Sequence, residues 1–237
     1  GATPADLEII VRDQRFGRQQ KPGRWWLGGD PVATAWHNAL SATFPRGEAM
    51  FIEAVKAHRD GVPPKLEEEI RAFVRQEINH TREHVVFNKA AVDAGYDLSK
   101  IDARLEELMA MIKQRPAIVN LTATMALEHY TAMMAHEFLA NPQHFKDAEP
   151  ETAAMWRWHA IEEIEHKGLV YDVWLHATRE WSAWKRWKVR ALIALLITRK
   201  YFGNRIRDAI GLLEQDGFTR SQAKRKLYAF LWWKPGM

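Results

Sequence analysis

Six residues of the sequence have the types and the spacing of ligands for two metal ions. Two glutamates are each followed three residues later by a histidine, and on a helix this spacing places both side chains on one face, where they reach the same ion. Two lone glutamates alternate with these pairs along the chain and would complete the coordination. In chain order the six are Glu48, Glu77, His80, Glu128, Glu163 and His166. The pattern predicts a dimetal centre.

The composition limits the chemistry of this centre. The chain contains no cysteine, which excludes thiolate metal sites, iron–sulfur clusters and cysteine nucleophiles. Oxygen and nitrogen ligands remain, and a set rich in carboxylates and histidines suits two iron ions, with manganese or zinc as alternatives. The sequence also contains no Gly-rich phosphate loop, no Gly-x-Ser-x-Gly motif and no dinucleotide fingerprint. It therefore gives no support to serine catalysis or nucleotide transfer.

Long helix-forming stretches carry these residues. Glycine and proline are sparse and clustered, and the stretches between the clusters predict an all-α fold. Residues 7–11 are expected to form a short extended arm, and no sheet is expected. The predicted helices cover residues 32–43, 47–59, 64–94, 101–114, 117–140, 151–180, 183–201, 205–215 and 221–230.

An apolar stripe with a seven-residue repeat marks the bundle-facing side of four predicted helices. The stripes at 47–59, 64–94, 117–140 and 151–180 are apolar except near one level, where carboxylates and imidazoles replace the apolar residues. Burying an unpaired carboxylate costs several kcal/mol, so polar residues inside a bundle must satisfy one another or share a cation. A metal pair explains all of them at once. An ordinary bundle with a buried polar network does so only at a high energetic cost.

The order and the spacing of the six residues are similar to those of the ferritin-like di-iron carboxylate proteins, over about residues 32–180. This resemblance implies a ferritin-like four-helix bundle in which residues 101–114 form part of the long crossover between the second and third bundle helices. It also implies a di-iron oxygenase or oxidase that activates dioxygen with electrons from an external donor and oxidises a mostly apolar small molecule. Residues 1–31 would form an N-terminal arm, and residues 181–237 extra C-terminal helices packed on the bundle.

Three shorter strings resemble a bacterial family labelled predicted metal-dependent hydrolase. They are Phe-Pro-Arg-Gly-Glu at 44–48, Gln-Glu-Ile-Asn-His at 76–80 and Glu-Glu-Ile-Glu-His-Lys at 162–167, and the resemblance spans most of the chain, including residues 230–236. A hydrolase would use the same ligands differently, because paired ions can activate water without any dioxygen. A two-metal-dependent hydrolase is therefore the alternative function.

Two further histidines accompany the six residues. His159 precedes Glu163 by four residues, and the resulting His-x-x-x-Glu-x-x-His pattern resembles the extra histidine of ferritin-like arylamine N-oxygenases. That resemblance implies that His159 is a seventh ligand. Otherwise it is a buried histidine that supports a ligand through a hydrogen bond. We also expect His84 to support a ligand through a hydrogen bond. It lies toward the same end of the site as His159 if the second and fourth bundle helices are antiparallel.

Gln76 and Glu162 directly precede the glutamates of the two Glu-x-x-His pairs. Related di-iron sites often place an acid at this position. We expect Glu162 to orient His80 and Gln76 to orient His166, each across the bundle. The competing interpretation is that both residues face solvent.

Two other classes of metal site remain open at this point. His80-Thr-Arg-Glu-His84 matches the His-x-x-Glu-His pattern of a zinc peptidase, in which two histidines bind zinc and the glutamate activates water. This interpretation leaves Glu77, Glu128 and the second Glu-x-x-His pair without a role, and it places Glu83 off the apolar stripe. Non-catalytic iron handling, as in ferritins, is the third class, and no acidic entry channel is identifiable for it.

The C-terminal end is basic and rich in tryptophan. Residues 179–237 contain 14 Lys and Arg against 4 Asp and Glu, and Trp181, Trp184 and Trp187 recur every three residues. The apolar run that follows is too short to span a bilayer. We expect the tryptophans to pack on the bundle; the alternative is a peripheral membrane contact through residues 181–202. No nucleic acid partner is expected, and the N-terminus lacks a basic stretch followed by an apolar one, which predicts a cytoplasmic protein.

Overall fold

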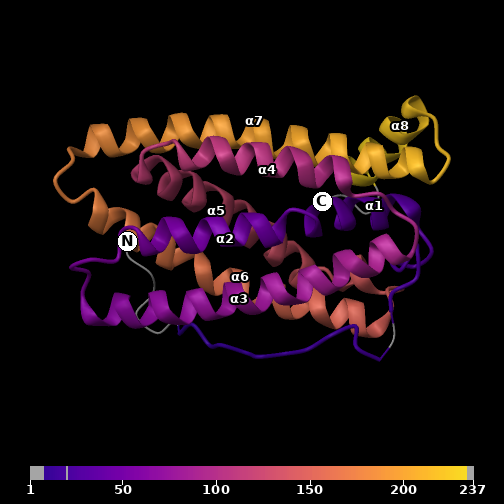
Figure 1. Ribbon diagram of the computed structural model, residues 1–237, viewed down its shortest axis with the longest axis horizontal. Helices are drawn as coiled ribbons and strands as arrows, with labels where there is room; N and C mark the ends of the chain where they lie inside the picture. The colour runs from indigo at the N-terminus through magenta and orange to yellow at the C-terminus, as the bar shows by residue number, and fades with distance from the viewer. Residues whose placement is uncertain (1–7, 20, 234–237) are drawn as a thin grey trace.

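The computed structural model describes residues 8–19 and 21–233 and confirms the predicted all-α class (Figure 1). Within these ranges no strand is present, and one isolated antiparallel bridge joins Leu27 to Ala148. The helices are α1 (Pro31–Ser41), α2 (Phe44–Lys56), α3 (Pro64–Asp93), α4 (Ser99–Lys113), α5 (Ala117–Ala140), a short 3-10 helix (Pro142–Phe145), α6 (Pro150–Ala177), α7 (Ala183–Gln215) and α8 (Arg220–Trp232).

Prolines determine where several helices begin. α2, α3 and α6 each have a proline within the first two helical positions, where a missing N–H is not needed and the fixed φ suits a helix. α1 also begins with a proline, and the Asp30 carboxylate accepts hydrogen bonds from the N–H groups of Val32 and Ala33 at 2.7 and 3.4 Å. Because Pro45 occupies this position in α2, the helix already begins at Phe44 instead of at residue 47.

Four long helices surround the level at which the candidate ligands lie. α5 packs along α6 and α2 packs along α3, while contacts between α2 and α5 and between α3 and α6 close the set. α4 connects the end of α3 to the start of α5. α7 lies along one edge of the molecule (Figure 1) and packs on α1 and α5. The ferritin-like character of this arrangement stays a prediction.

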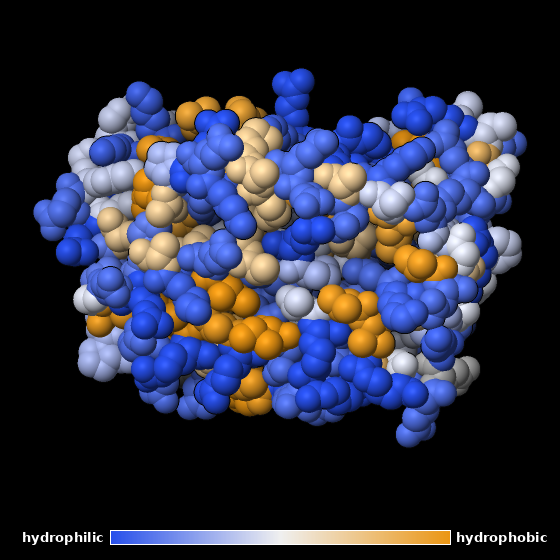
Figure 2. Space-filling model, viewed as in Figure 1, coloured by the Kyte–Doolittle hydropathy of each residue, from blue (hydrophilic) through white to orange (hydrophobic). Residues whose placement is uncertain are grey.

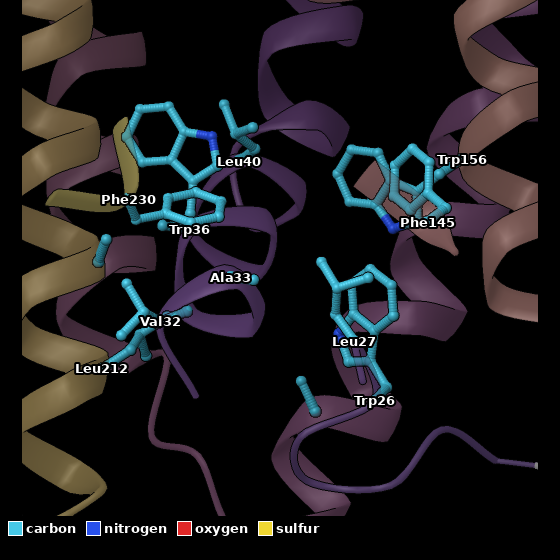
Figure 3. Packing of buried hydrophobic residues seen from close by; sticks show 14 of the residues in the cluster. Trp26, Leu27, Val32, Ala33, Trp36, Leu40, Phe145, Trp156, Leu212 and Phe230 are labelled. Carbon is cyan, nitrogen blue, oxygen red and sulfur yellow. The ribbon is translucent and has the colours of Figure 1, made fainter. Parts of the chain in front are cut away.

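Two apolar clusters lie on either side of the ligand level. Along α3, Phe73 belongs to one cluster and Phe87 to the other, with the buried Glu77, His80 and His84 between them. Along α6, Trp156 and Val173 divide between the clusters in the reverse order, so α3 and α6 are antiparallel. The cluster drawn in Figure 3 is strongly aromatic and includes Trp26, Trp36, Phe145, Trp156 and Phe230. The charged level is therefore bounded by apolar packing along the bundle in both directions.

α7 is one continuous helix through Gly203, where the sequence predicts a break between two helices. A glycine inside a helix costs about 1 kcal/mol relative to alanine. Beside it the buried Arg205 guanidinium donates to Ala39 O at 3.0 Å and to the Asp208 carboxylate at 2.8 Å. The bond to Ala39 anchors this part of α7 on α1, and the ion pair with Asp208 supports the turn that follows the glycine.

The tryptophans at the start of α7 also differ from the expectation. Trp184 and Trp187 are 66% and 57% exposed, and their rings stack on each other with centroids 4.9 Å apart. Packing of these two side chains on the bundle is therefore the wrong prediction. Trp181 is half-buried and has Lys185 Nζ 4.1 Å from its ring centroid. No helix in the described part of the chain combines the length and the apolarity needed to cross a membrane.

Candidate metal centre

All seven candidate ligands are buried at one level between α2, α3, α5 and α6. None is more than 4% exposed. One group of ligand atoms lies within 4.8 Å of one another on Glu48, His80 and His159, and a second such group on Glu77, Glu163 and His166. Glu128 joins the second group, because its Oε2 is 3.6 Å from His166 Nδ1. The structure therefore brings together every residue that the sequence proposed as a ligand.

Two carboxylates lie between the imidazoles of the Glu-x-x-His pairs. Glu77 Oε2 is 3.6 Å from His80 Nδ1, and its Oε1 is 3.1 Å from His166 Nδ1. Glu163 Oε1 is 3.6 and 3.7 Å from the same two nitrogens. Each of these carboxylates can therefore face two ions at once. Glu48 and Glu128 lie at the outer sides and can each face one ion.

Many oxygen and nitrogen atoms of this cluster that could bind a metal are buried and have no hydrogen-bond partner among the described residues. They are Glu48 Oε1, both oxygens of Glu77 and of Glu128, Glu163 Oε2, and the Nδ1 atoms of His80 and His166. Buried polar atoms without partners are costly, because they lose hydration and gain nothing in return. Once ionised, the four carboxylates would carry four negative charges, which two divalent cations would neutralise. The residues therefore fit a pair of divalent metal ions.

The outer nitrogens of the two histidines are held across the bundle. His80 Nε2 donates to Glu162 Oε2 at 2.9 Å, and His166 Nε2 donates to Gln76 Oε1 at 2.8 Å. Because each Nε2 is engaged outward, each Nδ1 faces the carboxylates. Glu162 and Gln76 are fully buried, which excludes the interpretation that they face solvent. Their role in orienting metal ligands stays a prediction.

Residues of the N-terminal arm bind these outer side chains. Arg12 N–H donates to Glu162 Oε1 at 2.9 Å, and Ile10 N–H donates to Glu165 Oε2 at 3.0 Å. The Arg12 guanidinium also contacts Glu165 Oε1 at 2.8 Å, and the Trp158 indole donates to Arg12 O at 3.0 Å. These contacts of the arm were not predicted from the sequence. The run 162–165 contains three glutamates, more than two ions need from this helix, and this surplus could have indicated that some of them bind other partners.

A chain of hydrogen bonds sets the ring orientation of His159. Asn88 Nδ2 donates to Ser41 O at 3.0 Å, so Asn88 Oδ1 accepts the Ser41 hydroxyl proton at 2.6 Å. His84 Nδ1 must then donate to Ser41 Oγ, 2.7 Å away, and its Nε2 lies 2.6 Å from His159 Nδ1. His159 Nε2 faces Glu163 Oε1 at 2.9 Å, a separation that requires a proton or a metal ion between the two atoms.

Burial and charge shift the pKa values of the cluster in opposite directions. Burial, reinforced by the charge of Glu163, raises the pKa of Glu128 to about 8. Burial alone would lower the pKa of His80, but the carboxylates of Glu162 and Glu77 raise it to about 10. Burial and the neighbouring His159 lower the pKa of His84 well below its usual value, so this ring is neutral and its Nε2 can accept the His159 Nδ1 proton.

The zinc peptidase pattern does not assemble. Both ring nitrogens of His84 already have partners, Ser41 and His159. Glu83 is buried, but its carboxylate accepts hydrogen bonds from Phe16 N–H at 2.8 Å and from the Arg18 guanidinium at 3.0 Å. The glutamate that should activate water is therefore occupied by the arm.

A small pocket adjoins the cluster on the side of His159 and Glu163. Its volume is about 20 Å³, enough for one or two water-sized molecules. Most of its lining is apolar and aromatic and comes from α5, α6 and the junction of α1 and α2. The lining residues are Leu40, Phe44, Thr131, Met134, Ala135, Phe138, Trp156, His159, Ala160 and Glu163.

A family model described as "Predicted metal-dependent hydrolase" matches residues 10–237. Comparison with curated proteins gave no match, and comparison with solved structures gave none.

Proposed function

The chain belongs to the family of predicted metal-dependent hydrolases. For this metal-dependent protein we propose that the seven buried ligands hold two iron ions, and that the protein oxidises a mostly apolar small molecule with dioxygen. One observation carries the proposal: unpartnered donor atoms converge at a buried level, directly beside a small apolar pocket. The ions would supply the electrons that reduce dioxygen, and an external electron donor would replace them.

The chain's own residues would have three tasks in this reaction. Glu77 and Glu163 neutralise both ions from between the two histidines. Glu162 and Gln76 hold the histidine rings so that their Nδ1 atoms face inward. The apolar lining of the pocket keeps bulk water away from the ligands and leaves a space of the size of dioxygen beside them.

Access favours oxidation over hydrolysis. A hydrolytic centre needs room for a polar substrate and a supply of water, whereas the pocket of about 20 Å³ is lined mainly by apolar side chains. Dioxygen is small and apolar and fits such a space. The description of the family favours the second candidate, a two-metal-dependent hydrolase in which the ions activate water.

The response of defined metal forms to dioxygen separates the two candidates. The metal-free protein is loaded anaerobically with about two equivalents of ferrous iron and mixed with oxygenated buffer, and iron oxidation is followed by Mössbauer spectroscopy together with dioxygen uptake. We expect rapid, paired oxidation of both iron ions. Glu163→Ala should abolish the paired signal, whereas Glu53→Ala, a change of an exposed glutamate on α2, should leave it intact.

Two results would contradict the oxygenase proposal. Ferrous protein that stays unchanged in dioxygen, while the zinc-loaded protein cleaves esters or amides, would replace the oxygenase proposal with the hydrolase. Oxidation at the same rate in Glu163→Ala and in the native chain would show that the iron reacts outside this site.

A further inference from the structure

The N-terminal half of α7 exposes a stripe of apolar side chains with helical spacing. Trp184, Trp187, Leu192, Leu195 and Leu196 are between 48% and 69% exposed. Successive positions are three, five, three and one residues apart, and at about 100° per residue all five fall on one side of the helix. None of the residues 183–200 is buried. We call the five side chains, together with Lys188 and Arg199 on the same side, the α7 surface.

The charge around this stripe has one sign. Residues 183–200 contain six Lys and Arg and no Asp or Glu. Lys188 and Arg199 lie among the apolar residues of the stripe and are exposed. Long basic side chains can place their stems along an apolar layer and their charges above it. The combination of exposed tryptophan, leucine and unopposed positive charge matches a helix that lies in the interface of an anionic bilayer.

The shape of the surface agrees with a flat partner. The N-terminal half of α7 lies along one edge of the molecule, away from α8, which packs at the other end of the helix (Figure 1). Apolar residues are visible along that upper edge in the space-filling view (Figure 2). The opposite side of α7 packs on α5 and α1, and the rings of Tyr130 and Tyr201 stack with centroids 6.2 Å apart. The ridge is therefore fixed to the bundle while its outer side stays exposed.

We propose that the α7 surface docks peripherally on an anionic lipid bilayer. The two tryptophans and the leucines enter the headgroup region, and Lys188 and Arg199 contact the lipid phosphates. A nucleic acid would use the positive charge but leave Leu195, which is 69% exposed, without a partner. A second protein chain would need an acidic groove to accept the ridge. The inference does not depend on the chemistry of the metal centre.

The test uses the full chain and vesicles of two compositions, phosphatidylcholine alone and phosphatidylcholine with about one third phosphatidylserine. Binding is measured by vesicle sedimentation and by the tryptophan emission maximum. We expect binding to the anionic vesicles only, a blue shift of the emission, and weakening as salt is added. At about fivefold for each basic residue, Lys188→Gln with Arg199→Gln should weaken binding by about 25-fold.

Matched variants on α8 control for general effects of charge and of tryptophan. Lys224→Gln with Arg225→Gln removes two exposed charges, and Trp232→Ser removes a tryptophan that is 63% exposed. These variants should bind as the native chain does, whereas Trp184→Ser with Trp187→Ser should lose the blue shift. Circular dichroism confirms that each variant is folded.

Three results would overturn the proposal. One is no binding to anionic vesicles at low salt. Another is an equal loss of binding in the α8 and α7 variants. The third is tighter binding to single-stranded RNA than to the vesicles, lost in the same α7 charge variants, which would identify nucleic acid as the partner.

Discussion

Glu128 is the least supported carboxylate of the candidate centre, and its removal has a predictable sign. Neither of its oxygens has a hydrogen-bond partner among the residues that the structure describes, and His166 Nδ1 is 3.6 Å away. Burial and the charge of Glu163 raise its pKa from 4.5 to about 8. Because the folded state favours the protonated form of Glu128, the free energy of unfolding of the metal-free chain is highest below about pH 4.5. It falls as the pH rises through 8.

The magnitude follows from the size of this shift. At 1.36 kcal/mol per pH unit, an ionised Glu128 costs the metal-free fold about 5 kcal/mol at pH 9. Glu128→Gln keeps the volume and removes the charge. The metal-free variant should therefore be more stable than the native chain at pH 9, by up to about 5 kcal/mol, and similar to it at pH 5.

Urea denaturation in the presence of a chelator measures this difference at both pH values. Glu53→Gln, an exposed position on α2, is the control and should change the free energy of unfolding by less than about 0.5 kcal/mol. With manganous ion added, the order should reverse, because the native chain binds the ions more tightly and gains stability from binding. A metal-free Glu128→Gln variant that is less stable at pH 9 would refute the reasoning.

Four further outcomes test the same site. Metal analysis should find about two ions per chain, and far fewer in Glu77→Ala; one ion that survives this change but is lost in His84→Ala would support the zinc peptidase interpretation instead. Because the pKa of His80 is raised to about 10, metal binding at pH 7.5 should release protons and weaken as the pH falls, which calorimetry in buffers of different ionisation enthalpy detects; binding without proton release would contradict this. Ser41→Ala removes the partner of His84 and should lower metal affinity about 10- to 100-fold in chelator competition, and an unchanged affinity would show that the hydrogen bonds from Ser41 to His159 do not support metal binding. A metal-bound crystal structure should place His159 Nε2 about 2.0–2.3 Å from an ion, and a ring bonded only to protein would make it a supporting residue.

The position of the cluster was predictable because burial and periodicity act together. Glu77 and Glu163 lie on apolar stripes, and a three-residue spacing on a helix leaves little freedom in where the following histidine points. The antiparallel order of α3 and α6 then brings His84 and His159 together, as their nitrogens at 2.6 Å demonstrate.

Other features could not be read from the sequence, for physical reasons. The arm holds Glu162 and Glu165 largely through backbone N–H groups, which every residue except proline has, so no side-chain pattern marks them. The exposure of Trp184 and Trp187 was misjudged because this part of α7 is apolar on more than one side, and periodicity then does not say which side faces the bundle.

The contacts of the arm also impose an order of assembly. The hydrogen bonds from Ile10 and Arg12 reach acceptors 155 and 150 residues later in the chain. A ribosome that adds about 5–20 residues per second makes these acceptors roughly 8 to 30 s after the donors. The segment that contains Ile10 and Arg12 is therefore among the last to dock. Until it does, the outer side chains behind His80 and His166 lack this cover, and we expect metal to enter most easily in that interval, before the arm closes over the edge of α3 and α6.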